Sequence, residues 1–399
     1  MADGSPTLPL VVELVDGAWR ARPSGSGAGI ALLTLLGSGG AVPDGFRILR
    51  GVSRPFEATE RRVAADQTNE SWIIGEAAVV KWTTEPLVGP QPDRLRRLVE
   101  AGFGQTPALW GMVEWRTPDG HWVPVATVND LVPGAEDGWT WCVDEARRAL
   151  AASGPPATPP APRGSGDGAG RVGQPFGAEL GALTAAMHLA LADQPAATAS
   201  PREALAWLAA AEELLGQTRS PLLDAHRDTI AAALGPLGRA AGTPLVAAHG
   251  DFHVGQLLRA PGGPLFVIDF DGNPTLTPQQ RSAPQPAALD IAGMLMSLEN
   301  VGHVVRRYAP EVPDAAAAAW TACVQAEFLY GYRASLASAG RGELLDESLL
   351  EAYGWQQLCR ELAYADGHLP RWRYVPEGAL RRRFGPAAGQ APAAGHEEA

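Results

Sequence analysis

Two acidic residues, each placed after a short apolar segment, constrain this sequence more than any other feature. Asp251 stands in the run His-Gly-Asp-Phe-His-Val-Gly-Gln, which follows the apolar residues 245–248, and Asp269 follows the apolar residues 265–268. Short apolar runs bounded by Gly and Pro are typical of buried strands. The separation of 18 residues therefore predicts two neighbouring strands that present both carboxylates at one rim.

The side chains of these two segments suit phosphoryl transfer. That reaction needs one carboxylate to accept the proton of the attacking hydroxyl group and another to hold magnesium on the phosphates. Asp251 fits the first role, whereas Asp269 and Gln256 offer a charged and a neutral oxygen to a hard cation. A lone His-Gly-Asp triplet is also compatible with a loop in which Asp251 and His253 only cap the backbone. The second segment favours the catalytic interpretation.

Three further polar residues of the two segments have alternative roles. His249 is predicted to brace the loop through hydrogen bonds rather than to take part in chemistry. His253 either touches the substrate or orients the catalytic carboxylate. Asp271 is either a second metal ligand or a substrate contact, or it forms a structural turn before Gly272.

Together the two segments resemble the catalytic loop and the metal-binding segment of aminoglycoside phosphotransferases and related small-molecule kinases. In that family the pattern reads His-Gly-Asp-x-His-x-x-Asn and then Ile-Asp. The resemblance implies a two-lobed, protein-kinase-like fold, ATP and Mg²⁺ as cofactors, Asp251 as the catalytic base, and Gln256 and Asp269 as magnesium ligands. Gln256 departs from the usual Asn, and in this respect the chain is similar to the maltokinases of actinobacteria.

The nucleotide side is indicated by a polar segment, residues 66–71, and by Lys81, the only lysine in the chain. A polar hairpin tip can place backbone N–H groups over phosphates, and a lysine on the next strand can pair with their charge. Polar turns and strand-end lysines are common, so the residues alone leave this interpretation open. The segment also resembles the maltokinase run Gln-Ser-Asn-Thr-Ser, which implies that Gln67, Asn69, Ser71 and Lys81 contact the phosphates.

The partner of this lysine and the adenine site are expected in the segments that follow. Kinases of this class pair the lysine with an acid on the next helix, here residues 92–103, where Asp93 and Glu100 are candidates, although both are also compatible with a solvated helix face. Residues 126–139 then change from strand to loop where the two lobes should join, and they resemble the maltokinase hinge. Backbone groups at such a hinge can hydrogen-bond adenine, which we expect near Val128, Asn129 and Leu131.

The acceptor side is indicated by an aromatic and polar helix at residues 353–366. Gln357, Glu361 and Tyr364 lie at helical spacings on one face, which can offer an acceptor, an anion and an aromatic edge to a polyhydroxylated ligand. The alternative is a solvated helix face. The run Leu-Cys-Arg-Glu, which ends at Glu361, resembles the glucosamine kinases of actinobacteria and implies an amine-bearing sugar. The expected substrate contacts are Asp251, His253, Asp271, Gln357, Glu361, Tyr364 and Asp366.

Apolar periodicity and Gly/Pro content indicate an α+β fold. Strands are expected at residues 10–15, 30–36, 72–74, 77–82 and 121–128, and helices at 141–152, 176–191, 204–215, 221–234 and beyond 289. We divide the chain into a β-rich N-terminal cap (1–60), a β-rich nucleotide-binding lobe (61–137), and a mainly helical lobe with the catalytic loop and acceptor site (138–382). Residues 154–173 are expected to form a flexible loop and 383–399 a disordered tail, because their composition cannot bury a core.

Composition restricts the partners of the protein. The formal net charge is −12 and no long run of Lys or Arg occurs, which argues against nucleic acid or an anionic membrane as the main partner. The sequence contains no membrane-spanning apolar stretch, and Cys142, Cys323 and Cys359 show neither disulfide nor zinc spacing. A cytoplasmic protein with a small-molecule substrate is the simplest interpretation.

These observations predict transfer of the γ-phosphoryl group of ATP to a hydroxyl group of glucosamine, giving glucosamine 6-phosphate. The alternatives are a kinase for maltose or for an aminoglycoside and, in another class, a non-catalytic nucleotide-binding sensor. A sensor needs no catalytic base, so the presence of Asp251, Gln256, Asp269 and Lys81 argues against it.

Overall fold

The computed structural model describes residues 7–63, 69–152 and 176–385. Gln67, the expected flexible loop 154–173 and residues 386–399 of the expected tail lie outside these ranges. The chain divides into two units. The first comprises Met1–Gly138, His249–Asp251 and Gly255–Ala283, and the second comprises Trp139–Ala248, Phe252–Val254 and Pro284–Ala399.

The first unit is built on a six-stranded antiparallel sheet. Its strands span Phe46–Arg50 (β3), Glu60–Arg62 (β4), Asn69–Ile74 (β5), Ala78–Thr83 (β6), Leu109–Arg116 (β7) and Trp122–Asp130 (β8). Their order is β3-β7-β8-β6-β5-β4. The predicted hairpin is confirmed, because β5 pairs with β6 along its whole length. β3 lies in the expected N-terminal cap but pairs with β7, so one sheet continues across the expected boundary at residue 60.

Residues 30–36, predicted as a strand, instead belong to the helix α1 (Ala28–Ser38). The run is rich in Ala and Leu, which favour helices over strands, and Gly27 and Gly39 bound it in left-handed conformations. The strand prediction was wrong because a short apolar run suits a buried helix as well as a buried strand. The strand predicted before it is confirmed, since β1 (Leu10–Val15) pairs with β2 (Ala18–Pro23).

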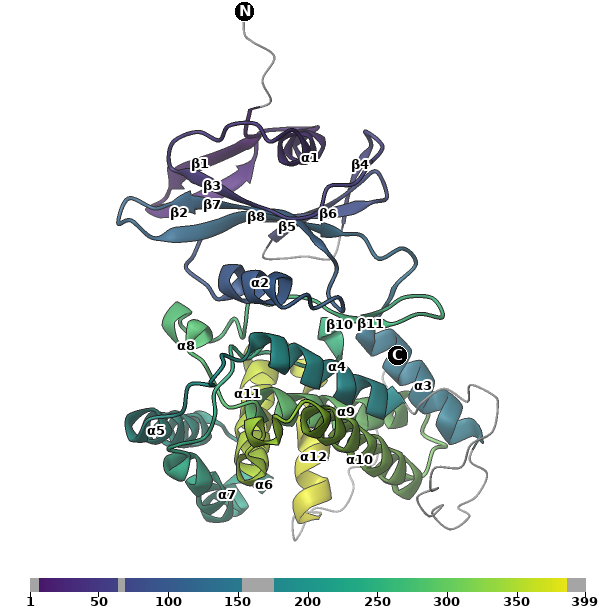
Figure 1. Ribbon diagram of the computed structural model, residues 1–399. Helices are drawn as coiled ribbons and strands as arrows, with labels where there is room; N and C mark the ends of the chain where they lie inside the picture. The colour runs from purple at the N-terminus through teal and green to yellow at the C-terminus, as the bar shows by residue number, and fades with distance from the viewer. Residues whose placement is uncertain (1–6, 64–68, 153–175, 386–399) are drawn as a thin grey trace, which may run out of the picture. The chain divides into compact units, whose positions relative to one another are not determined.

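The two faces of the sheet carry different helices. α1 lies on one face and α2 (Gln91–Glu100) on the other (Figure 1). Ala78, Val80 and Trp82 of β6 enter the same apolar core as the leucines of α1. Because successive side chains of a strand point to opposite faces, Lys81 lies on the face that α2 covers.

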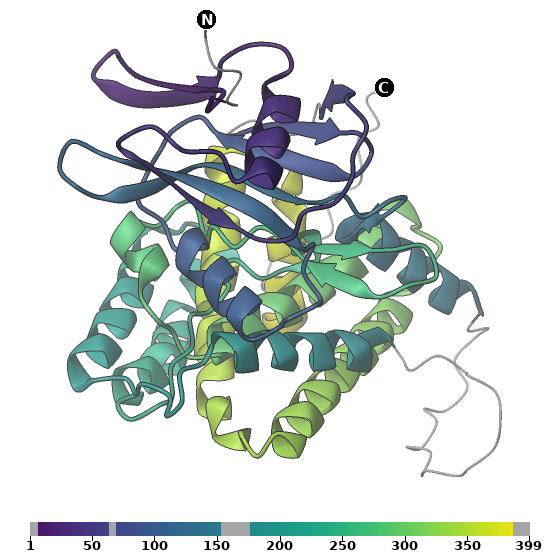
Figure 2. The ribbon, with the colours of Figure 1, turned by 45° about the horizontal axis from the view of Figure 1, so that its top comes forward.

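A three-stranded sheet carries the segment around Asp269. It consists of β9 (Glu136–Asp137), β10 (Leu257–Arg259) and β11 (Leu265–Val267), and β10 and β11 form a green ribbon in Figure 2. β11 confirms the strand predicted before Asp269. Its partner is β10, which follows Asp251, and not residues 245–248, which were predicted as the other strand. Those residues make only one isolated bridge within the described chain, from Val246 to Gln285.

The second unit is helical, as the sequence predicts. Residues 221–234, predicted as one helix, form two, because His226 leaves the helical conformation and its ring stacks on Phe384 with centroids 3.9 Å apart. The last helix continues to Phe384, so the expected tail begins within it. No helix in the described part of the chain has the length and apolar character needed to cross a bilayer. The principal helices are α3 (Gly138–Ala152), α4 (Phe176–Leu191), α5 (Pro201–Gln217), α6 (Pro221–Ala225), α7 (Arg227–Leu234), α9 (Ala288–Tyr308), α10 (Asp314–Ser338), α11 (Leu350–Gly367) and α12 (Tyr374–Phe384).

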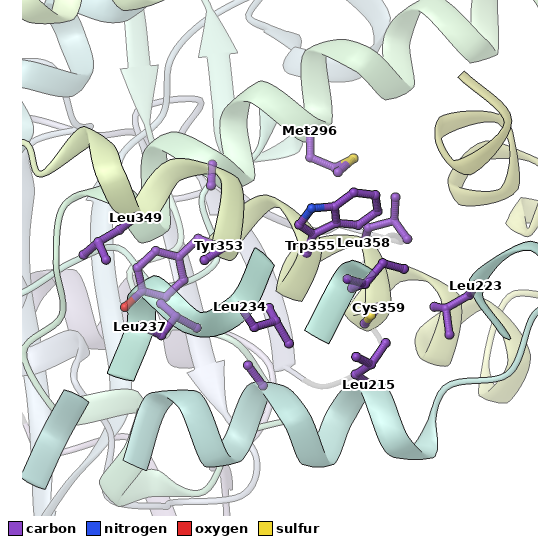
Figure 3. Close-up of a cluster of buried hydrophobic side chains, with 14 of the residues drawn as sticks. Leu215, Leu223, Leu234, Leu237, Met296, Leu349, Tyr353, Trp355, Leu358 and Cys359 are labelled. Carbon is purple, nitrogen blue, oxygen red and sulfur yellow. The ribbon is translucent and has the colours of Figure 1, made fainter. Parts of the chain in front are cut away.

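An apolar core holds α11 against its neighbours. Figure 3 shows Leu215 of α5, Leu234 of α7 and Met296 of α9 meeting Trp355 and Leu358 of α11. Burial of a large apolar side chain contributes about 1.5–3 kcal/mol. This core therefore fixes which face of α11 is buried and, with it, the direction of the polar residues on that helix.

Candidate active site

Three predicted residues meet in the first unit, around the single lysine. Lys81 Nζ donates to Oδ1 of Asp269 at 3.0 Å and to Oδ2 of Asp271 at 2.9 Å. Lys81 lies on β6, whereas both acids follow β11, and 190 residues separate Lys81 from Asp271. The fold therefore joins the predicted nucleotide strand to the predicted metal segment.

Charge and burial shift the ionisation of these three groups. Burial lowers the pKa of Lys81, but the carboxylates of Asp271 and Asp269 outweigh burial and raise that pKa above its ordinary value. Burial likewise raises the pKa of Asp269, but the ammonium group of Lys81 outweighs it and the pKa is lowered. For Asp271 burial prevails, and its pKa is raised. One ammonium group faces two carboxylates, so the cluster retains attraction for a further cation.

Backbone geometry sets the direction of the Asp269 carboxylate. Asp269 has φ +64°, in the left-handed region that residues other than glycine seldom adopt. The preceding N–H, of Ile268, donates to the carbonyl oxygen of Gln256 at 3.0 Å. His249 Nε2 donates to the carbonyl oxygen of Ile268 at 2.9 Å, which is the bracing role that the sequence favoured. The backbone of Gln256 thus lies beside the residue that precedes Asp269.

Gln256 and Asp269, the predicted magnesium ligands, carry the kind of donor atom that magnesium prefers. Both offer oxygen atoms, and Asp269 lies in a cluster with one other carboxylate, that of Asp271, and the ammonium group of Lys81. In the described ranges no group of three His, Cys, Asp or Glu residues could hold a metal ion by itself. Magnesium needs no such cage, because proteins usually hold it through one or two carboxylates together with substrate phosphates.

The carboxylate of Asp251 is tied to the same segment. Asn273 Nδ2 donates to Oδ1 of Asp251 at 3.1 Å. The other side of the amide is also fixed, since Asn273 Oδ1 accepts from the N–H of Thr275 at 3.0 Å and from its hydroxyl group at 2.6 Å. Asn273 was not among the predicted site residues, although it stands two residues after Asp271 in the same segment.

Arg94 of α2 was also missed. Its side chain is 3% exposed, and its guanidinium donates to the carbonyl oxygens of Phe270 at 2.8 Å and Arg281 at 2.9 Å. A sequence signal for it exists. The buried positions of α2 include residues 91, 94, 95 and 98, a helical stripe in which Arg94 takes the place of an apolar residue.

The two acids proposed as partners of Lys81 on α2 do not bond to it in this structure. Asp93 instead accepts a hydrogen bond from Arg97 at 2.8 Å, one turn along the same helix. Glu100, at the end of α2, is exposed. Lys81 pairs with Asp269 and Asp271, because those carboxylates reach the face of the sheet on which it lies.

The predicted phosphate-contacting segment lies beside Lys81. Ser71 is the direct cross-strand neighbour of Lys81, and Asn69 begins β5 opposite Thr83. Gln67 lies outside the described residues. Ser71 and Lys81 therefore point to the same face of the sheet, since directly paired residues do so.

The predicted adenine hinge is the end of β8. The N–H groups of Asp130 and Leu131 donate to the carbonyl oxygens of Ala108 and Ala77, at 2.9 and 2.8 Å. Asn129 Nδ2 donates to the carbonyl oxygen of Pro107 at 3.1 Å, and Val128 is paired on both sides within the sheet. Because these N–H groups already donate within the protein, an adenine contact here would use carbonyl oxygens or the residues that follow Leu131.

In the second unit, Glu361 is held by neutral amides. Asn300 Nδ2 of α9 donates to both carboxylate oxygens of Glu361, at 3.0 and 2.9 Å, and Gln357 Nε2 lies 3.4 Å from Oε1. Burial raises the pKa of Glu361 to about 7, and the bonds from Asn300 and Gln357 offset burial only in part. Asn300 was missed by the sequence analysis. It is 3% exposed, and its Oδ1 has no hydrogen-bond partner among the described residues.

A second acid close to Glu361 is neutralised by the last helix. Glu299 accepts hydrogen bonds from both terminal nitrogens of Arg383, at 3.0 and 2.9 Å, and Arg382 lies 3.7 Å away. Burial raises the pKa of Glu299, but His303 and Arg383 outweigh burial and lower it to about 2. These cations are committed to Glu299, whereas the hydrogen bonds to Glu361 come from uncharged groups.

The other predicted acceptor residues of α11 are placed differently. Asp366 forms an ion pair with Arg373, so its charge is already compensated. Tyr364 is 47% exposed, and its ring stacks on His368 with centroids 5.0 Å apart. His253 lies just before a short 3₁₀ turn, Val254–Gln256, that leads into β10. Glu361 with Gln357 is therefore the part of the predicted acceptor stripe that the structure brings together.

Comparisons with known proteins identify a matching family model and two similar curated proteins. The model of the phosphotransferase enzyme family matches residues 123–322. The chain is 40% identical over 392 residues to the glucosamine kinase of Streptacidiphilus jiangxiensis, covering 94% of this chain and 84% of that protein. It is 41% identical over 384 residues to the glucosamine kinase of Mycolicibacterium smegmatis, covering 92% and 91%.

Solved structures of glucosamine kinases are also similar to this chain. A glucosamine kinase in complex with glucosamine, ADP and inorganic phosphate matches with a TM-score of 0.76 at 33% identity, over 94% of each chain. Another crystal form of a glucosamine kinase matches with a TM-score of 0.76 over 96% of each chain. These matches confirm the expected α+β kinase fold and the resemblance to glucosamine kinases.

Proposed function

This chain belongs to the phosphotransferase enzyme family, and we propose that it is a glucosamine kinase, which transfers the γ-phosphoryl group of ATP to a hydroxyl group of glucosamine. The observation that carries the proposal is the constellation of Asp251, Asp269 and Lys81 within one unit, in a chain about 40% identical to curated glucosamine kinases. We assign the reaction to O6, the primary hydroxyl group, which is the least hindered on the ring.

Asp251 is the proposed base. Its carboxylate accepts the proton of the attacking hydroxyl group and orients that oxygen toward the γ-phosphorus. The hydrogen bond from Asn273 fixes one carboxylate oxygen, Oδ1, and restricts rotation of the group. The other oxygen, Oδ2, is then the atom proposed to take the proton.

Lys81, Asp269 and Gln256 form the proposed phosphate and metal site. Asp269 and Gln256 would hold magnesium through oxygen atoms, and the bound ion would neutralise charge on the phosphates. Lys81 supplies a point charge with three donors to the same phosphates. Asn69 and Ser71 of β5, with Gln67 before them, are proposed to cover the phosphates. Val128 and Asn129 at the end of β8, with Leu131 just after it, are proposed to contact adenine.

Glu361 is the proposed recognition group for the amine of the acceptor. It is a partly buried acid whose hydrogen bonds come from the neutral amides of Asn300 and Gln357, so among the described residues it has no direct ion pair of the kind that Glu299 has. An ammonium group placed there would compensate the charge of Glu361 and could donate to the unpartnered Oδ1 of Asn300. Maltose carries no cation, so this feature favours an amino sugar. His253, Asp271, Tyr364 and Asp366 remain proposed substrate contacts.

A substrate screen tests the proposal. ADP release is measured with glucosamine, glucose, maltose and a panel of aminoglycosides, and the product is analysed by ³¹P and ¹H NMR. Glucosamine should give the highest kcat/KM and a phosphate on O6. Faster turnover of maltose or an aminoglycoside would reassign the substrate. Binding of ADP without turnover of any acceptor would support a nucleotide sensor instead.

A further inference from the structure

A buried arginine bonds to both ends of the segment that directly follows Asp269, the proposed metal ligand. The guanidinium of Arg94 donates from Nη1 to the carbonyl oxygen of Phe270 at 2.8 Å and from Nη2 to that of Arg281 at 2.9 Å. The side chain is 3% exposed. One rigid planar group therefore connects the first and the last residue of the stretch 270–281 to helix α2.

An unfavourable left-handed residue, Asp269, directly precedes the stretch held in this way, and a left-handed glycine, Gly272, lies within it. Asp269 has φ +64° and Gly272 has φ +73°, and Phe270, whose carbonyl oxygen Arg94 binds, lies between them. A residue other than glycine in the left-handed region costs about 1–3 kcal/mol and persists only when its surroundings fix it. A Cβ at Gly272 would lie 3.1 Å from Arg94 Nη1, so the guanidinium also fills the space beside this turn.

The same stretch positions the groups used in the proposed reaction. Asp271 bonds to Lys81, and Asn273 bonds to Asp251. Asp269 immediately precedes the carbonyl group that Arg94 holds. A shift of the stretch would therefore move the proposed metal ligand, the lysine contact and the support of the base together.

We propose that Arg94 is a positioning residue that fixes the backbone of residues 270–281 so that Asp269 presents its carboxylate to magnesium. Helix α2 is thereby coupled to the metal segment through a guanidinium on backbone carbonyl groups, and not through an acid paired with Lys81. The inference rests on the magnesium role of Asp269 in the proposed function.

Binding measurements that need no turnover test this role. Wild type, Arg94→Met, Arg94→Lys and the control Arg97→Met are compared by calorimetric titration with ADP, with and without Mg²⁺, and by thermal shift against Mg²⁺ at saturating ADP. Arg97 is a suitable control because it lies on the same helix and bonds to exposed Asp93. Arg94→Met keeps an apolar stem of similar length but has no donors.

We expect Arg94→Met to bind ADP alone as wild type does. The Mg²⁺ concentration for half-maximal effect should rise about 10–100-fold, the usual cost of losing a group that orients a metal ligand. Arg94→Lys, which can reach one carbonyl group at a time, should fall between wild type and Arg94→Met. Arg97→Met should respond to Mg²⁺ like wild type.

A folded Arg94→Met variant with the wild-type Mg²⁺ response would overturn the inference. If that variant does not fold by circular dichroism, Arg94→Lys decides, and loss of folding in both would assign Arg94 to stability and also overturn it. Asp269→Asn distinguishes a failure of the proposed metal site from a failure of the role proposed for Arg94. If Asp269→Asn itself retains the full Mg²⁺ response, the proposed metal site fails; if only Arg94→Met retains it, Arg94 alone is misassigned.

Discussion

The side-chain amide of Asn273 donates a 3.1 Å hydrogen bond to Oδ1 of Asp251, across 22 residues of sequence. Asn273 belongs to the stretch that also carries Asp271 and that Arg94 closes. The proposed base is thus supported by the segment that directly follows Asp269, the proposed metal ligand. Loss of the base and loss of the metal ligand should be separable by choosing substitutions that keep this hydrogen bond or remove it.

Asp251→Asn should nearly abolish phosphoryl transfer. An amide of the same size cannot accept the proton of the hydroxyl group, and loss of a general base typically costs about 10²–10⁴ in rate. ADP affinity should stay close to wild type. Steady-state kinetics and calorimetric ADP binding measure the two effects. Asp93→Asn, on the outside of α2, is the matched control, and an Asp251→Asn enzyme that keeps most of its kcat would remove Asp251 from this role.

Asp269→Asn should raise the Mg²⁺ concentration needed for half-maximal activity and lower kcat. The substitution removes the negative charge that a hard cation prefers, although it keeps an oxygen atom. A Mg²⁺ titration of the initial rate measures both effects. Gln256→Leu should act in the same direction through loss of its oxygen. Unchanged titration curves for both variants would exclude this pair as the metal ligands.

Lys81→Ala should weaken ATP binding or its productive alignment. The variant loses the only lysine, whose Nζ is proposed to move its hydrogen bonds from Asp269 and Asp271 to the phosphates. We expect a higher KM for ATP with a smaller change in KM for glucosamine. Two-substrate kinetics distinguish these constants, and wild-type ATP kinetics in Lys81→Ala would contradict the assignment.

The ionisation of Lys81 can be measured directly, because the chain has no other lysine. The neighbouring carboxylates raise its pKa above the ordinary value in the ligand-free protein. Reductive methylation with ¹³C-formaldehyde should give one dimethyl-lysine NMR signal, separate from that of the N-terminus. Its titration should move to lower pH in Asp271→Asn, since one of the two carboxylates is then neutral. A titration unaffected by Asp271→Asn would show that the ion pair does not persist in solution.

Glu361→Gln should reduce kcat/KM for glucosamine and narrow the preference for glucosamine over glucose. A hydrogen bond to a charged group contributes about 1.5–3 kcal/mol, which corresponds to roughly 10- to 150-fold in binding. ATP kinetics should change little. Glu351→Gln, at an exposed position of the same helix, is the control. If Glu361→Gln discriminates between the sugars as well as wild type does, Glu361 is not the amine contact.

The pKa of Glu361 also predicts a pH-dependent stability in the absence of ligand. Burial raises this pKa from 4.5 to about 7, so the folded state favours the protonated acid. The resulting stabilisation is fully present below pH 4.5 and is lost as the pH rises through about 7. Wild type should therefore lose on the order of 1–3 kcal/mol relative to Glu361→Gln between pH 5 and pH 8. Urea unfolding at each pH measures the difference in the free energy of unfolding. The same pH dependence of this free energy in both proteins would refute the raised pKa of Glu361.

Local patterns in the sequence were sufficient to predict many of the helices and strands. The hairpin that ends near Lys81, the strand before Asp269 and the helix that carries Glu361 each follow from apolar periodicity and turn residues. The pairing of Asp251 with a second acidic segment predicted the chemistry, because phosphoryl transfer needs those groups. Residues 30–36 were misread as a strand because length and apolar character do not distinguish a buried helix from a buried strand.

Only the tertiary structure decided which of these groups meet. Lys81 and Asp271 are 190 residues apart, Arg94 and Phe270 are 176 apart, and Asn300 and Glu361 are 61 apart. Arg94 and Asn300 look like ordinary polar residues of amphipathic helices until the fold buries them. Burial removes water as a hydrogen-bond partner, so the protein must supply the acceptor or donor itself. The sequence by itself thus determined the kind of chemistry and the elements that carry it, and long-range packing determined the partners that hold each reactive group in place.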